Sequence, residues 1–340
     1  MDDIAFVFPG QGSQHPGMGL DLYETNDAAR KVFAAAEECL TGILDTIFSS
    51  TAEELMKTGN TQPAVFCVEL AAAAALTEAG ITPGMLAGFS LGEVTALTYS
   101  GAVTYPEGFR MVALRARLMQ KASETCASPM SMAAVLALDD RTVESVCREF
   151  KNVFPVNYNC PGQVAVSGPA DELSRLSQRV REMSGRVIPL KVGGAFHSPS
   201  MTDAAVGFLS ELASFDIRTP AIPLYSNMTA EPYGGDLAAL LAGQICAPVL
   251  WSRTILNMIK AGVRTFIEVG PGKVLSGLIT RISTDVKVLN VCDAASLAEA
   301  AAALNEAEAA AELNEAEAAA ALNEAEAAAA LRGGRRVAKG

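Results

Sequence analysis

A serine flanked by glycines is the first residue of this chain whose surroundings suggest chemistry. Ser90 lies in the run Gly88-Phe89-Ser90-Leu91-Gly92, a GxSxG pattern in which the glycines allow the sharp turn that presents a serine hydroxyl above a sheet. The apolar stretch from residue 85 to 89 predicts a short strand, and a helix is expected to begin at Leu91. Such a pattern also arises by chance in glycine-rich chains. The strand-turn-helix context nevertheless favours a nucleophile.

A serine nucleophile needs a base within hydrogen-bond reach, and histidine is the usual one. The chain contains two histidines, His15 and His197. His15 lies in a glycine-rich loop over residues 10–17, and His197 lies in the segment 193–199, just after the last strand of a small predicted unit. The sequence alone does not show which of the two is the base. Either one could also be a packed or surface residue, since an isolated histidine is more often structural than catalytic.

Two arginines interrupt an otherwise apolar stretch over residues 111–120 that is typical of a helix. Arg115 and Arg117 are two positions apart, so they are expected to point to nearly opposite faces of that helix. A guanidinium that faces a cleft can bind a carboxylate through two parallel hydrogen bonds. Two solvated arginines remain an equally good interpretation from the residues alone.

Composition and charge exclude several classes of function. The net charge of −12 over 340 residues argues against a nucleic-acid binder, which needs clustered lysines and arginines. The seven cysteines are scattered and form no CxxC pair, so we expect reduced thiols and no metal site. The glycine-rich runs at residues 10–19 and 270–274 lack the spacing of nucleotide-binding loops.

The start of the chain and its apolar runs bear on location. No apolar run reaches the roughly 18 residues that a membrane span needs. The chain opens with Asp2 and Asp3 in place of a basic region before an apolar stretch. We therefore expect a cytoplasmic protein without membrane contact.

The elements that must position the candidate residues follow two patterns. Strands at 4–8, 85–89, 266–269 and 286–291, with helices at 27–40 and 63–79, indicate an α/β arrangement. Between them, strands at 131–138, 153–158, 163–167 and 186–191 and helices at 140–150 and 169–184 follow the β-α-β-β-α-β order of a ferredoxin-like unit. The smaller unit is therefore predicted to be inserted into the larger one.

The composition changes near Ala294, after which LNEAEAAA recurs. Successive leucines are nine residues apart, so Leu304 and Leu313 would lie on opposite sides of a helix and form no continuous coiled-coil seam. Alanine and glutamate still favour helix. A solvated helical tail that ends in a basic tip, dispensable for function, is the expectation for residues 294–340.

Several short motifs in a fixed order resemble the malonyl-CoA:acyl carrier protein transacylases and the related acyltransferase domains of fatty acid and polyketide synthases. The resemblance covers nearly all of residues 4–292. Its motifs are Phe8-Pro9-Gly10-Gln11-Gly12-Ser13-Gln14, Thr61-Gln62-Pro63-Ala64, Gly88 to Glu93, Arg115 with Met119-Gln120, Asn157-Tyr158-Asn159-Cys160-Pro161-Gly162-Gln163, Ala195-Phe196-His197-Ser198 and Gly270-Pro271-Gly272-Lys273-Val274-Leu275.

This resemblance implies an α/β fold, and the change of composition near Ala294 adds a tail to it. An α/β-hydrolase-like catalytic subdomain would comprise residues 1–127 and 195–293. A ferredoxin-like subdomain would comprise residues 128–194, and an Ala/Glu-rich helix with a basic tip would follow over 294–340.

The resemblance also implies roles for individual residues. Ser90 would attack the malonyl thioester, and His197 would take and later return the proton. The backbone N–H groups of Gln11 and Leu91 would form the oxyanion hole. Arg115 would hold the malonyl carboxylate.

Further implied contacts surround this centre. Gln62, Asn159 and Phe196 would contact the substrate, and the backbone carbonyl of Leu250 would orient the histidine. The elbow has Phe89 where the family commonly has histidine, a departure that bears only on secondary contacts of the serine.

The implied partners are malonyl-CoA and acyl carrier protein, both of them substrates. We expect no metal or other cofactor. We also expect the protein to be a monomer. The product would feed fatty acid synthesis, with a polyketide pathway as the alternative.

Two competing functions share parts of this pattern. A serine thioesterase or other hydrolase shares the elbow, but it requires an acidic residue after the serine and a histidine late in the chain, and it leaves Gln11 and Arg115 without a role. A non-catalytic interaction protein would keep the fold and dock through the helical tail.

Overall fold

A computed structural model describes residues 3–126 and 128–307 of the chain, which divides into one unit up to residue 297 and a second from residue 298 onward. The first unit contains a five-stranded parallel sheet in the order β7-β2-β1-β8-β9. Every residue of β1 and of β8 is buried, as expected for central strands covered on both faces. The strands are β1 (Ile4–Phe8), β2 (Met85–Gly88), β7 (Leu224–Tyr225), β8 (Thr265–Val269) and β9 (Lys287–Val291).

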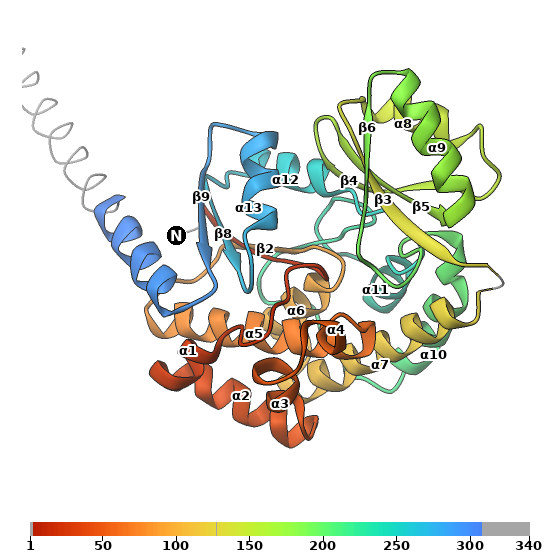
Figure 1. Cartoon of the computed structure of the whole chain (residues 1–340). Helices are drawn as coiled ribbons and strands as arrows, with labels where there is room; N and C mark the ends of the chain where they lie inside the picture. The colour runs from red at the N-terminus through yellow and green to blue at the C-terminus, as the bar shows by residue number, and fades with distance from the viewer. Residues whose placement is uncertain (1–2, 127, 308–340) are drawn as a thin grey trace, which may run out of the picture. The chain divides into compact units, whose positions relative to one another are not determined.

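Helices cover both faces of this sheet (Figure 1). The long α5 (Thr58–Glu78) is buried along most of its length and packs against α2, α6 and α7. On the other face, side chains of α12 and α13 form one apolar cluster with side chains of β1 and β8. Besides α5, the labelled α-helices outside the antiparallel part are α1 (Leu20–Thr25), α2 (Asp27–Cys39), α3 (Ile43–Phe48), α4 (Ala52–Leu55), α6 (Gly92–Tyr99), α7 (Tyr105–Glu124), α10 (Thr202–Leu212), α11 (Leu237–Gly243), α12 (Trp251–Lys260) and α13 (Val274–Ile282).

A separate antiparallel sheet lies between α7 and α10 in the sequence. Its strand order is β4-β5-β3-β6, and α8 and α9 pack on one face through a valine-rich cluster. Figure 1 shows this sheet and its two helices, in green and yellow, beside the parallel sheet. The elements are β3 (Met130–Leu136), α8 (Asp140–Cys147), β4 (Phe154–Cys160), β5 (Gln163–Pro169), α9 (Ala170–Glu182) and β6 (Arg186–Pro189).

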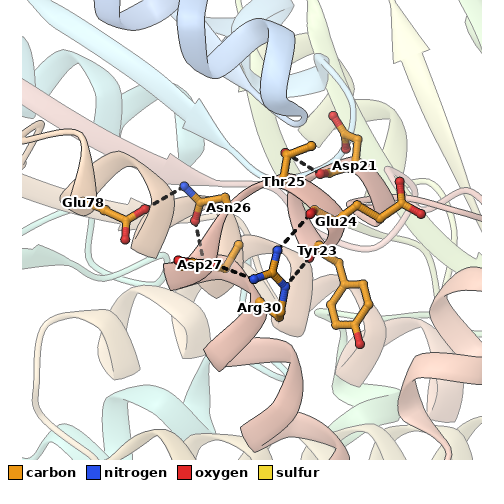
Figure 2. A network of polar contacts seen from close by, with 9 residues as sticks. Asp21, Tyr23, Glu24, Thr25, Asn26, Asp27, Arg30 and Glu78 are labelled. Carbon is orange, nitrogen blue, oxygen red and sulfur yellow. Dashed lines mark hydrogen bonds and ion pairs between the residues drawn. The ribbon is translucent and has the colours of Figure 1, made fainter.

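The junction between α1 and α2 illustrates how local polar contacts fix the helical layer (Figure 2). Asn26 caps α2, because its Oδ1 accepts a hydrogen bond from the Ala29 N–H at 2.8 Å. Its Nδ2 donates to the Glu78 carboxylate at 2.9 Å, which links the start of α2 to the end of α5. Arg30 donates to the carbonyls of Tyr23 at 3.0 Å and Glu24 at 2.8 Å. These bonds satisfy the last carbonyls of α1.

The predicted elements agree with the structure except at a few boundaries. The helix expected over residues 63–79 begins five residues earlier, at Thr58, and holds Pro63 inside it, so one backbone hydrogen bond of the helix is lost. Strand β7 was not predicted, since two residues carry no periodicity. Residues 294–307 are helical as expected of the tail, and the rest of the predicted tail lies outside the described residues.

Candidate active site

The serine of the GxSxG run lies at a sharp turn between β2 and α6. Ser90 has a φ of 56°, in the left-handed region that non-glycine residues rarely adopt. Both glycines of the run are required by packing: a Cβ on Gly88 would lie 1.9 Å from the Gly92 carbonyl carbon, and a Cβ on Gly92 would lie 2.1 Å from the Phe8 oxygen. The start of α6 therefore lies directly against the end of β1, and Ser90 remains partly exposed.

His197 is the histidine that meets this serine. Its Nε2 lies 2.7 Å from Ser90 Oγ, and its Nδ1 lies 2.7 Å from the Gln244 backbone oxygen. A carbonyl can only accept, so Nδ1 carries the proton and Nε2 presents its lone pair to the serine hydroxyl. His197 also has a left-handed backbone, with a φ of 60°. The alternative candidate, His15, is exposed, and its Nδ1 lies near the Pro16 carbonyl.

The carbonyl that orients the histidine is not the expected one. The Leu250 oxygen accepts hydrogen bonds from Thr254, and the oxygen facing His197 belongs to Gln244. The prediction of Leu250 was therefore wrong by six positions. The segment between α11 and α12 bends so that its beginning, and not its end, lies at the histidine.

Burial sets the protonation state of the histidine. Desolvation, and then the positive charge of Arg115, lower the pKa of His197 from its usual 6.5 to about 4. The imidazole is therefore neutral at physiological pH, which is the state a general base needs.

Arg115 lies on the buried face of α7 and reaches the same serine. Its Nη2 donates to Ser90 Oγ at 3.2 Å, and its Nη1 donates to Gln62 Oε1 at 2.7 Å. Its side chain is fully buried, whereas Arg117 is exposed, so the prediction that the two arginines face opposite sides is confirmed. Burial lowers the pKa of Arg115 to about 10, which still leaves it positively charged at neutral pH.

Sequence reasoning missed the side chains that connect these residues. Gln244 donates to the Ser90 carbonyl at 2.8 Å and to Glu93 at 3.1 Å, and it accepts from Arg115 at 3.0 Å. Asn227 accepts from the Ser90 N–H at 2.6 Å and donates to the Gly88 carbonyl. The only available signal was Glu93, an acid in an apolar helix, because the others are amides in segments without periodicity.

The expected oxyanion donors come from two adjacent segments. Leu91 directly follows the serine, and Gln11 follows β1 in a loop whose Gly10 lies so close to the elbow that a Cβ there would be 2.8 Å from the Phe89 oxygen. Among the described residues, neither backbone N–H has a hydrogen-bond partner. Both are therefore free to bind an oxygen.

Of the other predicted contact residues, Asn159 lines a cavity of about 270 Å³ beside the elbow, together with Gln11 and Phe89 among others. Asn159 is buried, and its Oδ1 has no hydrogen-bond partner. Phe196 is buried next to His197 in the chain and packs near Gly194. The structure thus brings Ser90, His197, Arg115 and Gln62 into direct contact, and it puts Gln11 and Asn159 on the neighbouring cavity.

This arrangement supports covalent acyl chemistry on a serine. A hydroxyl with a neutral imidazole on one side and a guanidinium on the other can attack a carbonyl carbon while a second, anionic end of the same substrate is held.

In the part of the chain that the structure describes, no cluster of His, Cys, Asp and Glu side chains could hold a metal. None of the described helices combines the length and the apolar composition that a membrane span requires.

Comparison with known proteins agrees with this geometry. The family model described as the acyl transferase domain matches residues 5–301. A malonyl CoA-acyl carrier protein transacylase of Bacillus subtilis is 39% identical over 314 residues, which cover 90% of this chain and 98% of the relative. A transacylase of the same name from Staphylococcus aureus is 36% identical over 299 residues, covering 86% of this chain and 96% of the relative.

Solved structures show the same similarity. The crystal structure of the malonyl CoA-acyl carrier protein transacylase of Clostridium perfringens matches with a TM-score of 0.88 and 34% identity, over 91% of this chain and 99% of the other. A malonyl-transacylase in complex with its type II polyketide synthase acyl carrier protein matches with a TM-score of 0.83 and 32% identity, over 87% and 97%. The chain therefore belongs to the acyl transferase family, among the malonyl-CoA:acyl carrier protein transacylases.

Proposed function

We propose that this enzyme transfers a malonyl group from malonyl-CoA to the phosphopantetheine thiol of acyl carrier protein through a malonyl ester on Ser90. The observation that carries the proposal is the placement of Ser90 Oγ, 2.7 Å from His197 Nε2 and 3.2 Å from the Arg115 guanidinium. One hydroxyl thus contacts both a base and a cation that can bind a carboxylate. This arrangement fits a substrate that has a thioester at one end and a carboxylate at the other.

The first half-reaction forms the acyl-enzyme. As Ser90 Oγ attacks the thioester carbon, its proton moves to His197 Nε2, and the Gln244 carbonyl stabilises the imidazolium through the Nδ1 proton. The tetrahedral intermediate then collapses, the C–S bond breaks, and His197 returns the proton to the departing CoA sulfur.

The second half-reaction reverses these roles. The pantetheine thiol of acyl carrier protein gives its proton to His197 and attacks the ester carbon. The C–O bond to Ser90 breaks as the proton passes to the serine oxygen. The enzyme is regenerated without net proton exchange, as a ping-pong mechanism requires.

The backbone N–H groups of Gln11 and Leu91 are proposed as the oxyanion hole. Their position on either side of the elbow and their lack of another partner support this role, and each such donor contributes roughly 3 kcal/mol to transition-state stabilisation. Because backbone groups do this work, side-chain substitutions at these positions need not abolish it.

Substrate contacts follow from charge and position. Arg115 is proposed to bind the malonyl carboxylate through two hydrogen bonds, with Gln62 holding the guanidinium in place. Asn159, whose buried oxygen lacks a partner, is proposed to accept a hydrogen bond from the pantetheine arm. Phe196 is proposed to limit the width of the acyl pocket.

Further properties are part of the proposal. The larger part of the fold is proposed to be α/β-hydrolase-like and the antiparallel part ferredoxin-like, with the boundaries predicted above. The enzyme is proposed to work without cofactors, as a monomer and in the cytoplasm, where its seven free cysteines would remain reduced. Fatty acid synthesis is the proposed destination of the product.

Intact mass spectrometry after mixing with malonyl-CoA tests the central claim. We expect the protein mass to rise by one malonyl group, the adduct to disappear when phosphopantetheinylated acyl carrier protein is added, and Ser90→Ala to form no adduct. A thioesterase would instead release malonate as fast as it transfers it. Hydrolysis at the rate of transfer would therefore overturn the proposal.

A further inference from the structure

A carboxyl group is buried within reach of the proposed malonyl site. Glu93, in the first turn of α6, has no exposed surface. Its Oε1 accepts hydrogen bonds from the Tyr233 hydroxyl and, at 3.3 Å, from the Asn227 N–H, and its Oε2 accepts from Gln244 Nε2 at 3.1 Å. The acyl-transfer steps described above do not use this carboxyl.

Arg115 is the cation nearest to this carboxyl, and it lacks a direct counter-ion. Its hydrogen-bond acceptors are a hydroxyl and two neutral amide oxygens, and no ion pair joins it to any described carboxylate. Its Nε is buried without a partner. A buried cation of this kind favours an anion supplied by the substrate.

Gln244 bridges Glu93 and Arg115 through hydrogen bonds. Its Nε2 donates both to the Ser90 carbonyl and to Glu93, so its Oε1 must face Arg115. One fixed amide therefore separates the arginine from the buried carboxyl. Because Glu93, Gln244 and Arg115 are all buried, solvent screens little of the effect that a negative charge on Glu93 has on whatever Arg115 binds.

We infer that Glu93 determines the preference for charged over uncharged acyl groups, because its neutral form leaves the Arg115 charge to the malonyl carboxylate and its ionised form repels that carboxylate. The inference rests on the malonyl transfer proposed above and deepens it. An acetyl group carries no charge, so its binding is independent of the ionisation of Glu93. Glu93 is a positioning and specificity residue and touches no reacting atom.

The groups around Glu93 make this ionisation accessible. Desolvation raises the pKa of Glu93 to about 8, even though Tyr233, Asn227, Arg115 and Gln244 all act to lower it. Tyr233, from the segment after β7, keeps its proton because burial and Glu93 itself raise its pKa. Arg115 from α7 stays charged, and His197 stays neutral. Of these groups, Glu93 is therefore the one whose pKa, about 8, lies closest to neutral pH.

The test is the pH dependence of KM for malonyl-CoA and for acetyl-CoA. As pH rises through the pKa of Glu93, we expect KM for malonyl-CoA to rise about tenfold while kcat and the KM for acetyl-CoA change little. Glu93→Gln cannot ionise and keeps one accepting oxygen in place of two, and it is expected to flatten the malonyl profile. Glu69→Gln is the matched control, because Glu69 is also fully buried with a raised pKa and contacts Thr95, away from Gln244.

A second variant and a direct measurement guard against misfolding of Glu93→Gln. Tyr233→Phe removes a hydrogen bond that lowers the pKa of Glu93, so the midpoint of the KM rise should move to higher pH. In a Ser90→Ala background, calorimetry in buffers of different ionisation enthalpy should detect uptake of a proton on malonyl-CoA binding at about pH 8.5. The same uptake should be absent from Ser90→Ala/Glu93→Gln.

The outcomes separate the two claims. A wild type that loads malonyl with a flat KM profile, or a Glu93→Gln variant with the wild-type profile, overturns the role of Glu93 alone. A wild type that forms no malonyl adduct at any pH overturns both this role and the proposed transfer.

Discussion

Arg115 is a buried cation whose present partners are a hydroxyl and two amides. We predict that Arg115→Ala lowers malonyl loading relative to acetyl loading by about 30-fold or more, because a buried charged hydrogen-bond pair is lost. Competition between malonyl-CoA and acetyl-CoA, followed by mass spectrometry, measures the ratio. Arg117→Ala is the control, since Arg117 is exposed on the opposite face of α7. Unchanged selectivity of Arg115→Ala would contradict the carboxylate role.

The residues that the sequence identified are those whose type is rare in their surroundings. Ser90 between glycines and Arg115 in an apolar helix are conspicuous, and His197 was one of only two histidines. Gln244 was missed because its contributions, a backbone oxygen and a bridging amide, depend on how the segment after α11 bends. Leu250 was the position that the family resemblance implied, and because a backbone carbonyl leaves no trace in the residue type, the sequence offered nothing to correct it.

At the scale of elements, the contact between β1 and the start of α6 positions the serine. A methyl group on Gly92 would lie 2.1 Å from the Phe8 oxygen. We therefore predict that Gly92→Ala lowers the free energy of unfolding by about 3 kcal/mol or more and abolishes acylation of Ser90. Chemical denaturation and the mass adduct measure the two effects.

Gly277→Ala provides the matched control for that substitution. Gly277 lies in the interior of α13, is exposed, and has open space where a Cβ would be. Alanine there should stabilise the protein by about 0.5–1 kcal/mol through helix propensity alone. Equal effects of the two substitutions would show that the close approach at Gly92 is unimportant.

Elements with a clear period were predictable, and those held by tertiary contacts were not. The strands and helices between residues 130 and 189 each show a clear hydrophobic period, so their order followed from the sequence. Strand β7 has two residues and exists because the Leu86 N–H bonds to the Pro223 carbonyl beside β2. The early start of α5 at Thr58 likewise depends on packing that outweighs the local effect of Pro63.

At the scale of the whole molecule, the residues of the site all belong to the unit that ends at residue 297. We predict that deleting residues 298–340 leaves the rate of malonyl loading on Ser90 within about twofold of the full chain. Quenched-flow mass spectrometry of both chains measures this rate. If the deletion abolished loading, the result would favour a function that depends on the tail. That function is the one of the non-catalytic interaction protein described in the sequence analysis.

The left-handed backbone at both catalytic residues sets stability against activity in this chain. Ser90 and His197 each occupy a left-handed conformation that glycine tolerates far better, at a cost of roughly 1–2 kcal/mol per residue. Replacing either residue by glycine would thus raise the free energy of unfolding and remove the catalytic activity. The two side chains that make the chain an enzyme therefore stand at positions where they cost the fold stability.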